Sequence, residues 1–188
     1  MTESTDTTLA TLPVTGTYVV DPIHSNIEFV ARHLVGAKVR GRFTSFTGTI
    51  TIADPIESST VHAEVEAASI STGQDQRDEH VRSADFLDAE NFPTFTLEST
   101  GLTRKDDAHW VLETNVTVRG TTKPVTFDLE YLGTGPGMAP DSVVAAFDAR
   151  ADVDRRDFGV SFGAALGAGN LVVGNKVTLE LSIEAHRQ

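Results

Sequence analysis

The segment VHAEVEA at residues 61–67 alternates apolar and polar residues without a break. Successive side chains of a β-strand point to opposite faces, so the valines and alanines would share one face and the histidine and glutamates the other. The same alternation runs through most of residues 21–95. A long series of such segments, with no cluster of catalytic groups among them, predicts a container with an apolar inside better than it predicts an enzyme.

The composition excludes several classes of protein. A length of 188 residues fits one domain, and 39% hydrophobic against 22% charged residues supplies enough apolar material for a core. The mean hydropathy of −0.12 and the lack of any run of about 18 apolar residues argue against an integral membrane segment. A net charge of −12 would repel nucleic acid. The chain has no cysteine, which excludes disulfides, thiolate metal sites and thiol nucleophiles.

The start of the chain differs in composition from the rest. Residues 1–15 are rich in threonine and serine and contain no continuous apolar block. We therefore expect a flexible tail at 1–15 and one barrel domain over residues 16–188. A secretory signal would begin with basic residues and continue into an apolar segment, and neither is present. The expected location is the cytoplasm.

The pattern predicts about eight to ten strands. They are expected among the segments near residues 16–20, 26–31, 38–43, 46–52, 61–70, 92–98, 110–113, 115–119, 123–131, 143–151 and 177–184. The alternation stops in an acidic, helix-like stretch, and we expect one or two short helices near residues 75–88 covering one end of the sheet. Glycine and proline predict a loose loop at 133–140, and small residues a mobile loop at 164–170. A closed sheet of about eight strands can either fill itself or hold one small ligand.

Several short motifs, taken in order along residues 16–185, resemble those of the YceI-like polyisoprenoid-binding proteins. The matching positions are Tyr18, Asp21-Pro22, His24-Ser25, Ile27, Phe29 and His33; Gly41, Phe43, Phe46 and Gly48; Ser69-Ile70 and Thr72; Arg77-Asp78, His80, Ser83 and Asp85-Phe86-Leu87-Asp88; Phe92-Pro93; Arg119-Gly120-Thr121-Thr122-Lys123-Pro124-Val125; and Arg156-Asp157-Phe158-Gly159-Val160. Each motif alone is weak, since a run such as RGTTKP is merely turn chemistry. The whole series is specific.

The resemblance implies an all-β fold, an antiparallel lipocalin-like β-barrel of about eight strands. It also implies an internal apolar channel that takes a long-chain isoprenoid lipid, such as a polyprenyl chain or a quinone, or a similar amphiphile, and it suggests a homodimer. No other cofactor is implied. Many members of this family are exported to the periplasm, and this sequence departs from them in having no signal.

Alternating apolar positions, mostly aromatic, are the candidate lining of the channel. They are Ile27, Phe29, Val39, Phe43, Phe46, Val65, Phe86, Phe95, Phe127, Phe147, Phe158 and Phe162. Burial of a methylene group stabilises by about 0.8 kcal/mol, so a long tail could bind here without any hydrogen bond. The alternative is that these side chains fill a solid core.

The histidines do not predict a metal site. None of the six forms the i, i+4 pair of a helical metal site, so a buried, hydrogen-bonding role is the better interpretation of His24. Ser25 directly follows His24 and has no glycine-flanked turn, which argues against a serine hydrolase. We therefore predict no catalytic residue and no metal ligand.

A polar head group of the lipid has its own candidates. Arg77, Asp78 and His80 lie on the expected helix, and an arginine can donate to a diphosphate or a quinone oxygen. His24 is a fourth candidate. The alternative for Arg77 and Asp78, which the sequence favours, is to tie the helix to the end of a strand. The bases Lys38, Arg40 and Arg42 alternate with the lining and should face solvent.

Three hypotheses about function follow. The first is a non-catalytic protein that binds, transports or stores an isoprenoid lipid. The second is an isoprenoid-modifying or stress-related enzyme that uses the same cavity, with His24 or the group Arg77, Asp78 and His80 as acid and base. The third is a protein-interaction module with a solid core.

Overall fold

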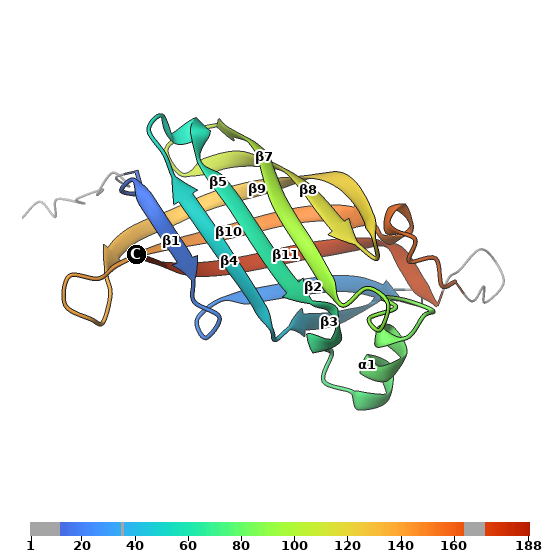
Figure 1. Ribbon diagram of the computed structural model, residues 1–188. Helices are drawn as coiled ribbons and strands as arrows, with labels where there is room; N and C mark the ends of the chain where they lie inside the picture. Colours follow the sequence, from blue (N-terminus) through green and yellow to red (C-terminus); the bar gives the residue numbers. More distant parts are fainter. Residues whose placement is uncertain (1–11, 35, 164–171) are drawn as a thin grey trace, which may run out of the picture.

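The computed structural model describes residues 12–34, 36–163 and 172–188. These residues form eleven strands, one α-helix and three short 3-10 helices (Figure 1). In chain order they are β1 (Gly16–Val20), β2 (Asn26–His33), β3 (Ala37–Phe43), β4 (Phe46–Ile52), η1 (Ile56–Ser58), β5 (Thr60–Glu66), η2 (Ala67–Ser69), β6 (Ile70–Ser71), α1 (Asp75–Arg82), β7 (Thr94–Arg104), β8 (His109–Val118), β9 (Thr121–Pro136), β10 (Val143–Asp154), η3 (Arg155–Phe158) and β11 (Val173–Arg187).

Eight of the strands close into an antiparallel barrel. Their order around the ring is β1, β4, β5, β7, β8, β9, β10, β11, and β11 pairs again with β1. Tyr18 of β1 lies opposite Ile50 of β4 on one side and opposite Arg187 of β11 on the other. The predicted closed barrel of about eight antiparallel strands is confirmed.

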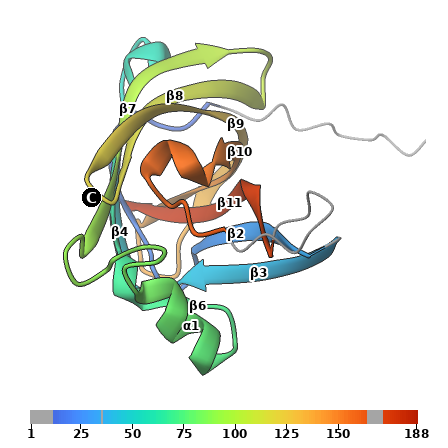
Figure 2. The ribbon, with the colours of Figure 1, turned by 90° about the vertical axis from the view of Figure 1, so that its right-hand side faces the viewer.

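The remaining three strands extend one side of the barrel. β2 pairs with residues 173–182 of β11. β1 pairs with a later part of the same strand, residues 185–187. β3 pairs with β2, and the short β6 pairs with β3. Figures 1 and 2 show β2 and β3 lying together beneath the barrel, next to α1. No ladder joins β6 to β7 in the described sheet, so a seam runs between these two strands.

The period-2 pattern decides which side chains enter the barrel. Along β4 the residues at positions 46, 48, 50 and 52 are buried, and those between them are more exposed. Gly41 of β3 is required at a close approach, because a Cβ atom there would lie 2.4 Å from the ring of Phe29. Without a side chain at this position, the Phe29 ring can approach β3 closely.

Helix α1 packs against β6 at the edge of the sheet. The side chain of Gln74 accepts a hydrogen bond from the backbone of Arg77 at the start of the helix, and Asp75 in the first turn suits the positive end of the helix dipole. Near its end, Arg82 donates to the carbonyl oxygens of Ala68 and Ile70 at 2.7 and 2.8 Å. In Figure 2, α1 lies at the foot of the barrel and η3 crosses the middle of its opening.

Three local predictions were wrong. The strand expected over residues 61–70 ends at Glu66, and η2 separates it from β6. Residues 110–113 and 115–119 were expected as separate strands, but β8 is continuous from His109 to Val118. Residues 133–136 were expected in a loose loop, but they complete β9 and pair with β10. A register shift beside Phe147 and the positive φ of Gly133 allow the ladder to continue past the irregularity.

Of the expected N-terminal tail, the structure describes residues 12–15. Residues 1–11 of the expected tail and the expected mobile loop at 164–170 lie outside the described residues. Residues 12–15 contact the barrel: the Tyr18 hydroxyl donates to the carbonyl of Val14, and Arg187 donates to the carbonyl of Thr15, both at 2.8 Å. In the described part of the chain, no helix has the length and apolar character needed to cross a membrane.

Candidate functional site

A cavity of about 800 Å³ runs along the inside of the barrel. Its wall extends from Pro13, Ile52 and Ile56, near the connection between β4 and β5, to Arg77 and Phe162 at the end beside α1. Ligand pockets commonly measure roughly 300–1,000 Å³. The interior of this barrel is therefore large enough to hold a small molecule, and it is not a solid core.

Eleven of the twelve predicted lining residues stand in this wall. They are Ile27, Phe29, Val39, Phe43, Val65, Phe86, Phe95, Phe127, Phe147, Phe158 and Phe162. They come from six strands, from η3 and from the segments that follow α1 and η3. Whether they touch a ligand stays a prediction.

Phe46 is the exception. Its side chain is buried among core residues that include Tyr18, Val20 and Ile50, and it is absent from the described wall of the cavity. The prediction that it faces inward was right, since it alternates with the exposed Thr47. Its ring fills space between neighbouring side chains instead of bordering the void.

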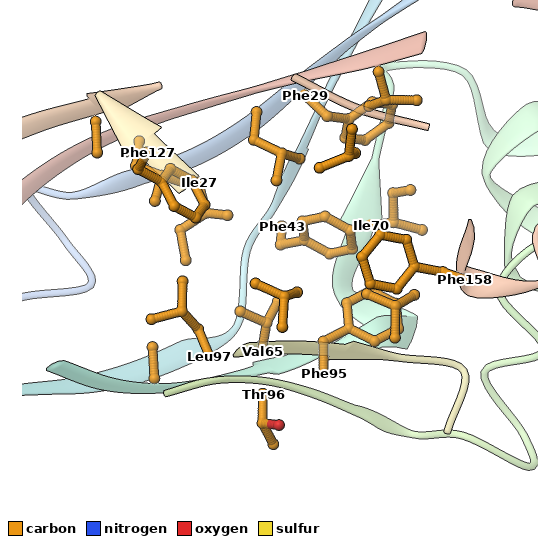
Figure 3. A pocket seen from close by; sticks show the side chains of 18 of the residues that line it. Ile27, Phe29, Phe43, Val65, Ile70, Phe95, Thr96, Leu97, Phe127 and Phe158 are labelled. Atoms are coloured by element: carbon orange, nitrogen blue, oxygen red, sulfur yellow. The ribbon is translucent and has the colours of Figure 1, made fainter. Parts of the chain in front are cut away.

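Aromatic rings narrow the cavity near the seam. The Phe43 ring lies 6.0 Å from that of Phe29 and 5.6 Å from that of Phe95, measured between centroids. Figure 3 shows these rings and that of Phe158 directed toward one space, with Ile27 and Phe127 farther along the barrel. Contacts among the rings hold this part of the wall in place while leaving room between them.

The prediction omitted most of the aliphatic wall. Leucine and isoleucine side chains line the middle of the cavity at alternating strand positions, among them Ile70, Leu97, Leu112, Leu129, Leu179 and Leu181. The signal that could have found them was the same alternation that found the phenylalanines.

Polar residues gather at the end of the cavity beside α1. Thr72, Gln74, Gln76, Arg77 and His80 all belong to the wall there. Arg77 donates from Nε to the Thr72 hydroxyl at 2.7 Å and from Nη2 to the Thr72 carbonyl at 2.9 Å. This end of the wall therefore offers a guanidinium and an imidazole, whereas most of the other wall residues are apolar.

Asp78 is not in the described wall of the cavity. It is buried and accepts hydrogen bonds from the backbone amide of Thr72, at 2.8 Å, and from the Thr72 hydroxyl. These bonds tie α1 to the end of β6, which is the structural alternative that the sequence favoured for Arg77 and Asp78.

His80 takes part in a small aromatic cluster at the same end. Its ring meets those of Phe86 and Phe162 at 5.1 Å, nearly perpendicular to each, and Nε2 lies 2.9 Å from a carboxylate oxygen of Asp85. Nearby, Arg155 is 6% exposed and donates to the carbonyl oxygens of Val160, Val173 and Gly174 and to the side chain of Asn175. Burial lowers the pKa of Arg155.

His24 is far from this arrangement. It is exposed, in the connection between β1 and β2, and it is absent from the described cavity wall. The prediction of a buried histidine was wrong, but the predicted hydrogen bond is present, to Asp21 at 2.7 Å. That bond raises the pKa of His24 and lowers the pKa of Asp21. His24 therefore does not border the cavity as described.

The Ser25 hydroxyl is engaged with the backbone. It donates to the carbonyl of Glu184 at 3.1 Å and accepts from the Glu184 amide at 2.9 Å. The outward basic residues are placed as predicted: Lys38, Arg40 and Arg42 are exposed, and Arg40 pairs with Glu180 at 2.6 Å.

Comparison with protein families and curated sequences gives consistent matches. The model of the family described as YceI-like domain matches residues 18–185. A UPF0312 protein of Staphylococcus aureus is 30% identical over 169 residues, which cover 89% of this chain and 95% of that protein. A UPF0312 protein of Vibrio cholerae is 32% identical over 171 residues, covering 89% of this chain and 85% of that one.

Solved structures share the fold. BcnA of Burkholderia cenocepacia superposes with a TM-score of 0.77 at 18% identity, covering 88% of this chain and 98% of that one. A polyisoprenoid binding domain from Saccharophagus degradans, implicated in plant cell wall breakdown, superposes with a TM-score of 0.68 at 12% identity, covering 93% of this chain and 100% of that one. At these identities the likeness concerns the fold alone.

Proposed function

Because this chain belongs to the YceI-like domain family, we propose that it binds a long-chain isoprenoid lipid, such as a polyprenyl chain or a quinone, inside its barrel without transforming it. The observation that carries the proposal is the cavity of about 800 Å³ with an apolar wall along most of its length. The polyisoprenoid binding domain with the same fold supports the choice of ligand.

The energetics favour a tail that needs no polar partner. Burial of fifteen to twenty carbon atoms would contribute on the order of 10 kcal/mol before losses. Ordering the chain and immobilising the ligand would return several kcal/mol or more of this gain. The remainder still allows micromolar or tighter binding, so the protein can carry or store such a lipid.

The polarity of the wall suggests an orientation. We place the head group beside α1, where Arg77 and His80 stand in the wall, and the tail toward Phe127 and Phe147. Asp78 and His24, the other head-group candidates, are outside the described wall, and Asp78 is committed to Thr72. Of the acid and base candidates for the enzymatic alternative, Arg77 and His80 are the two that stand in the described wall.

Native mass spectrometry tests the proposal. The untagged chain, purified from cells without added lipid, is expected to retain an additional mass of several hundred daltons that organic solvent removes. The emptied chain should then take up geranylgeraniol or a long-chain ubiquinone in one-to-one ratio. Mass analysis of the extract identifies the ligand.

The decisive negative result is a chain that carries no extra mass and that binds neither prenyl lipid after extraction. Uptake of palmitate with the affinity of geranylgeraniol would keep the lipid cavity but contradict the isoprenoid class. Recovery of a chemically altered prenyl compound after incubation would favour the enzyme.

A further inference from the structure

A separate group of side chains lies on the outside of the barrel, where β11 changes partner. β11 pairs with β2 up to the contact between Ser182 and Asn26 and with β1 from Ala185 onward. The connection between β1 and β2 bridges this change. Ala185 is fully buried, so Glu184 and His186 on either side of it face outward, toward that connection.

Two imidazoles and two carboxylates converge at this point. Asp21 Oδ2 lies 2.7 Å from His24 Nδ1 and 3.3 Å from His186 Nε2. Glu184 Oε1 lies 3.4 Å from His186 Nε2 and 3.8 Å from His24 Nδ1. None of the four residues belongs to the described cavity wall. The cluster is therefore independent of the lipid cavity.

The backbone holds the cluster in place. The Asp21 amide donates to the Glu184 carbonyl at 2.8 Å, and Ser25 bonds both the amide and the carbonyl of Glu184. The second oxygen of Asp21, Oδ1, accepts from the amide of Ile23 at 2.8 Å, which turns Oδ2 toward the two histidines. Such supporting bonds orient the side chains before any ligand arrives.

One nitrogen atom of the cluster is buried without a hydrogen-bond partner among the described residues. His186 Nε2 is shielded from solvent and forms no hydrogen bond with any described residue. It faces carboxylate oxygens of Asp21 and Glu184 at 3.3 and 3.4 Å without bonding geometry to either. A shielded ring nitrogen without a hydrogen bond is costly unless a ligand occupies the space between these atoms.

We propose that Asp21, His24, Glu184 and His186 bind a divalent first-row transition metal ion, of which Zn²⁺ fits best. Imidazole nitrogen and carboxylate oxygen are common zinc ligands, and two imidazoles disfavour Mg²⁺ and Ca²⁺. Four ligands at about 2.0–2.1 Å in a tetrahedron lie about 3.3–3.4 Å from one another. The two distances from His186 Nε2 have these values already.

The ligand atoms of Asp21, His24 and Glu184 lie within 4.8 Å of one another, and binding draws His24 and His186 together around the ion. The ion displaces the proton that His24 and Asp21 share, and the 2.7 Å contact widens while the 3.8 Å contact to Glu184 shortens. The His24 side chain is 55% exposed, so it can move and the ion can enter from solvent. The bound ion joins the connection between β1 and β2 to the last strand, where the barrel closes.

Equilibrium dialysis of the untagged full-length chain against Zn²⁺ tests the proposal. We expect one ion per chain and a higher melting temperature in its presence, because a ligand that binds only the folded state stabilises it. Co²⁺ should give the visible absorption bands of a four-coordinate site. His24→Ala and His186→Ala should each weaken Zn²⁺ binding at least about ten-fold, as loss of even a supporting residue can do.

His109→Ala is the matched control. His109 is exposed and lies 2.9 Å from Asp106, but no second histidine joins that pair among the described residues. Its replacement should leave zinc binding unchanged. The proposal is overturned by an absence of zinc binding, by equal binding in the double variant His24→Ala/His186→Ala, or by an equal loss in the control. If His186→Ala does not fold, zinc binding by His24→Ala, a substitution at an exposed position, decides the test.

Discussion

The rings of Phe43 and Phe95 meet edge to face, with centroids 5.6 Å apart and planes at 83°. Phe43 ends β3 and Phe95 stands near the start of β7, two strands that share no ladder in the described sheet. Such a ring pair contributes about 0.5–1.5 kcal/mol beyond the burial of its area. At the seam, the Phe43 and Phe95 side chains therefore join strands that backbone hydrogen bonds do not join. The same two rings also form part of the cavity wall.

Phe43→Asp should abolish lipid loading. A carboxylate at this position would lie beside the tail, and burying it unpaired costs several kcal/mol. We expect the affinity for geranylgeraniol to fall at least about 100-fold, measured by titration of the emptied chain. Thr51→Asp on the outer face of β4, opposite Thr17 and Thr60, is the control and should bind normally. Equal affinity of the two variants for geranylgeraniol would contradict the placement of the lipid tail inside the barrel.

Ala149→Phe should shorten the usable cavity. Ala149 lines the middle of the wall and lies between Leu129 and Leu181 on the neighbouring strands. A ring here would block part of the channel at a cost in stability of about 1–3 kcal/mol. We expect the affinity for geranylgeraniol to fall about ten-fold or more, and that for the shorter geraniol to change little. An equal loss of affinity for both alcohols would contradict the placement of the longer lipid tail along this part of the cavity.

The contact between Asp78 and Thr72 should control the docking of α1. Asp78→Ala leaves the amide and the hydroxyl of Thr72 without their acceptor, which costs about 1–3 kcal/mol. Amide hydrogen exchange in α1 should accelerate relative to that in β8. In a double-mutant cycle with Thr72→Val, the two effects on the free energy of unfolding should be less than additive. Strict additivity would mean that the two side chains act separately.

Arg155→Met should destabilise the barrel more than Arg156→Met. The buried Arg155 satisfies three carbonyl oxygens and one side-chain amide, whereas the exposed Arg156 pairs, among the described residues, with Asp154 alone. We expect urea unfolding to show losses of about 2–4 kcal/mol for Arg155→Met and at most about 1 kcal/mol for Arg156→Met. The reverse order would show that water replaces the lost donors of Arg155.

Ionisation of Asp154 should make the free energy of unfolding depend on pH in the acid range. Hydrogen bonds from the side chain and backbone of Arg156 lower its pKa from 3.8 to about 2. A folded-state pKa below the unfolded one contributes stability above pH 3.8 that is lost as the pH falls through about 2. The stability difference between the wild type and Asp154→Asn should therefore shrink over this interval. Carboxyl NMR titration gives the midpoint directly, and a midpoint near 3.8 would contradict the assignment.

The strand pattern could be predicted because it is local. Alternation along residues 61–67 or along β4 depends only on neighbouring side chains pointing to opposite faces. The same rule placed eleven of twelve predicted side chains at the cavity wall. It could not separate Phe46 from Phe43, because both point inward and only the packing of distant residues decides which of them borders empty space.

The sequence by itself determined the strands, their inward faces and the resemblance to a family. The tertiary structure decided the closure of β11 on β1, the volume left inside, and the meeting of Asp21 and His24 with Glu184 and His186. No two histidines have the i, i+4 spacing of a helical metal site, and His24 and His186 are about 160 residues apart in the chain, so spacing alone argued against a metal site. Such contacts depend on the register of strands that pair only after the ring closes, and no local pattern carries that information.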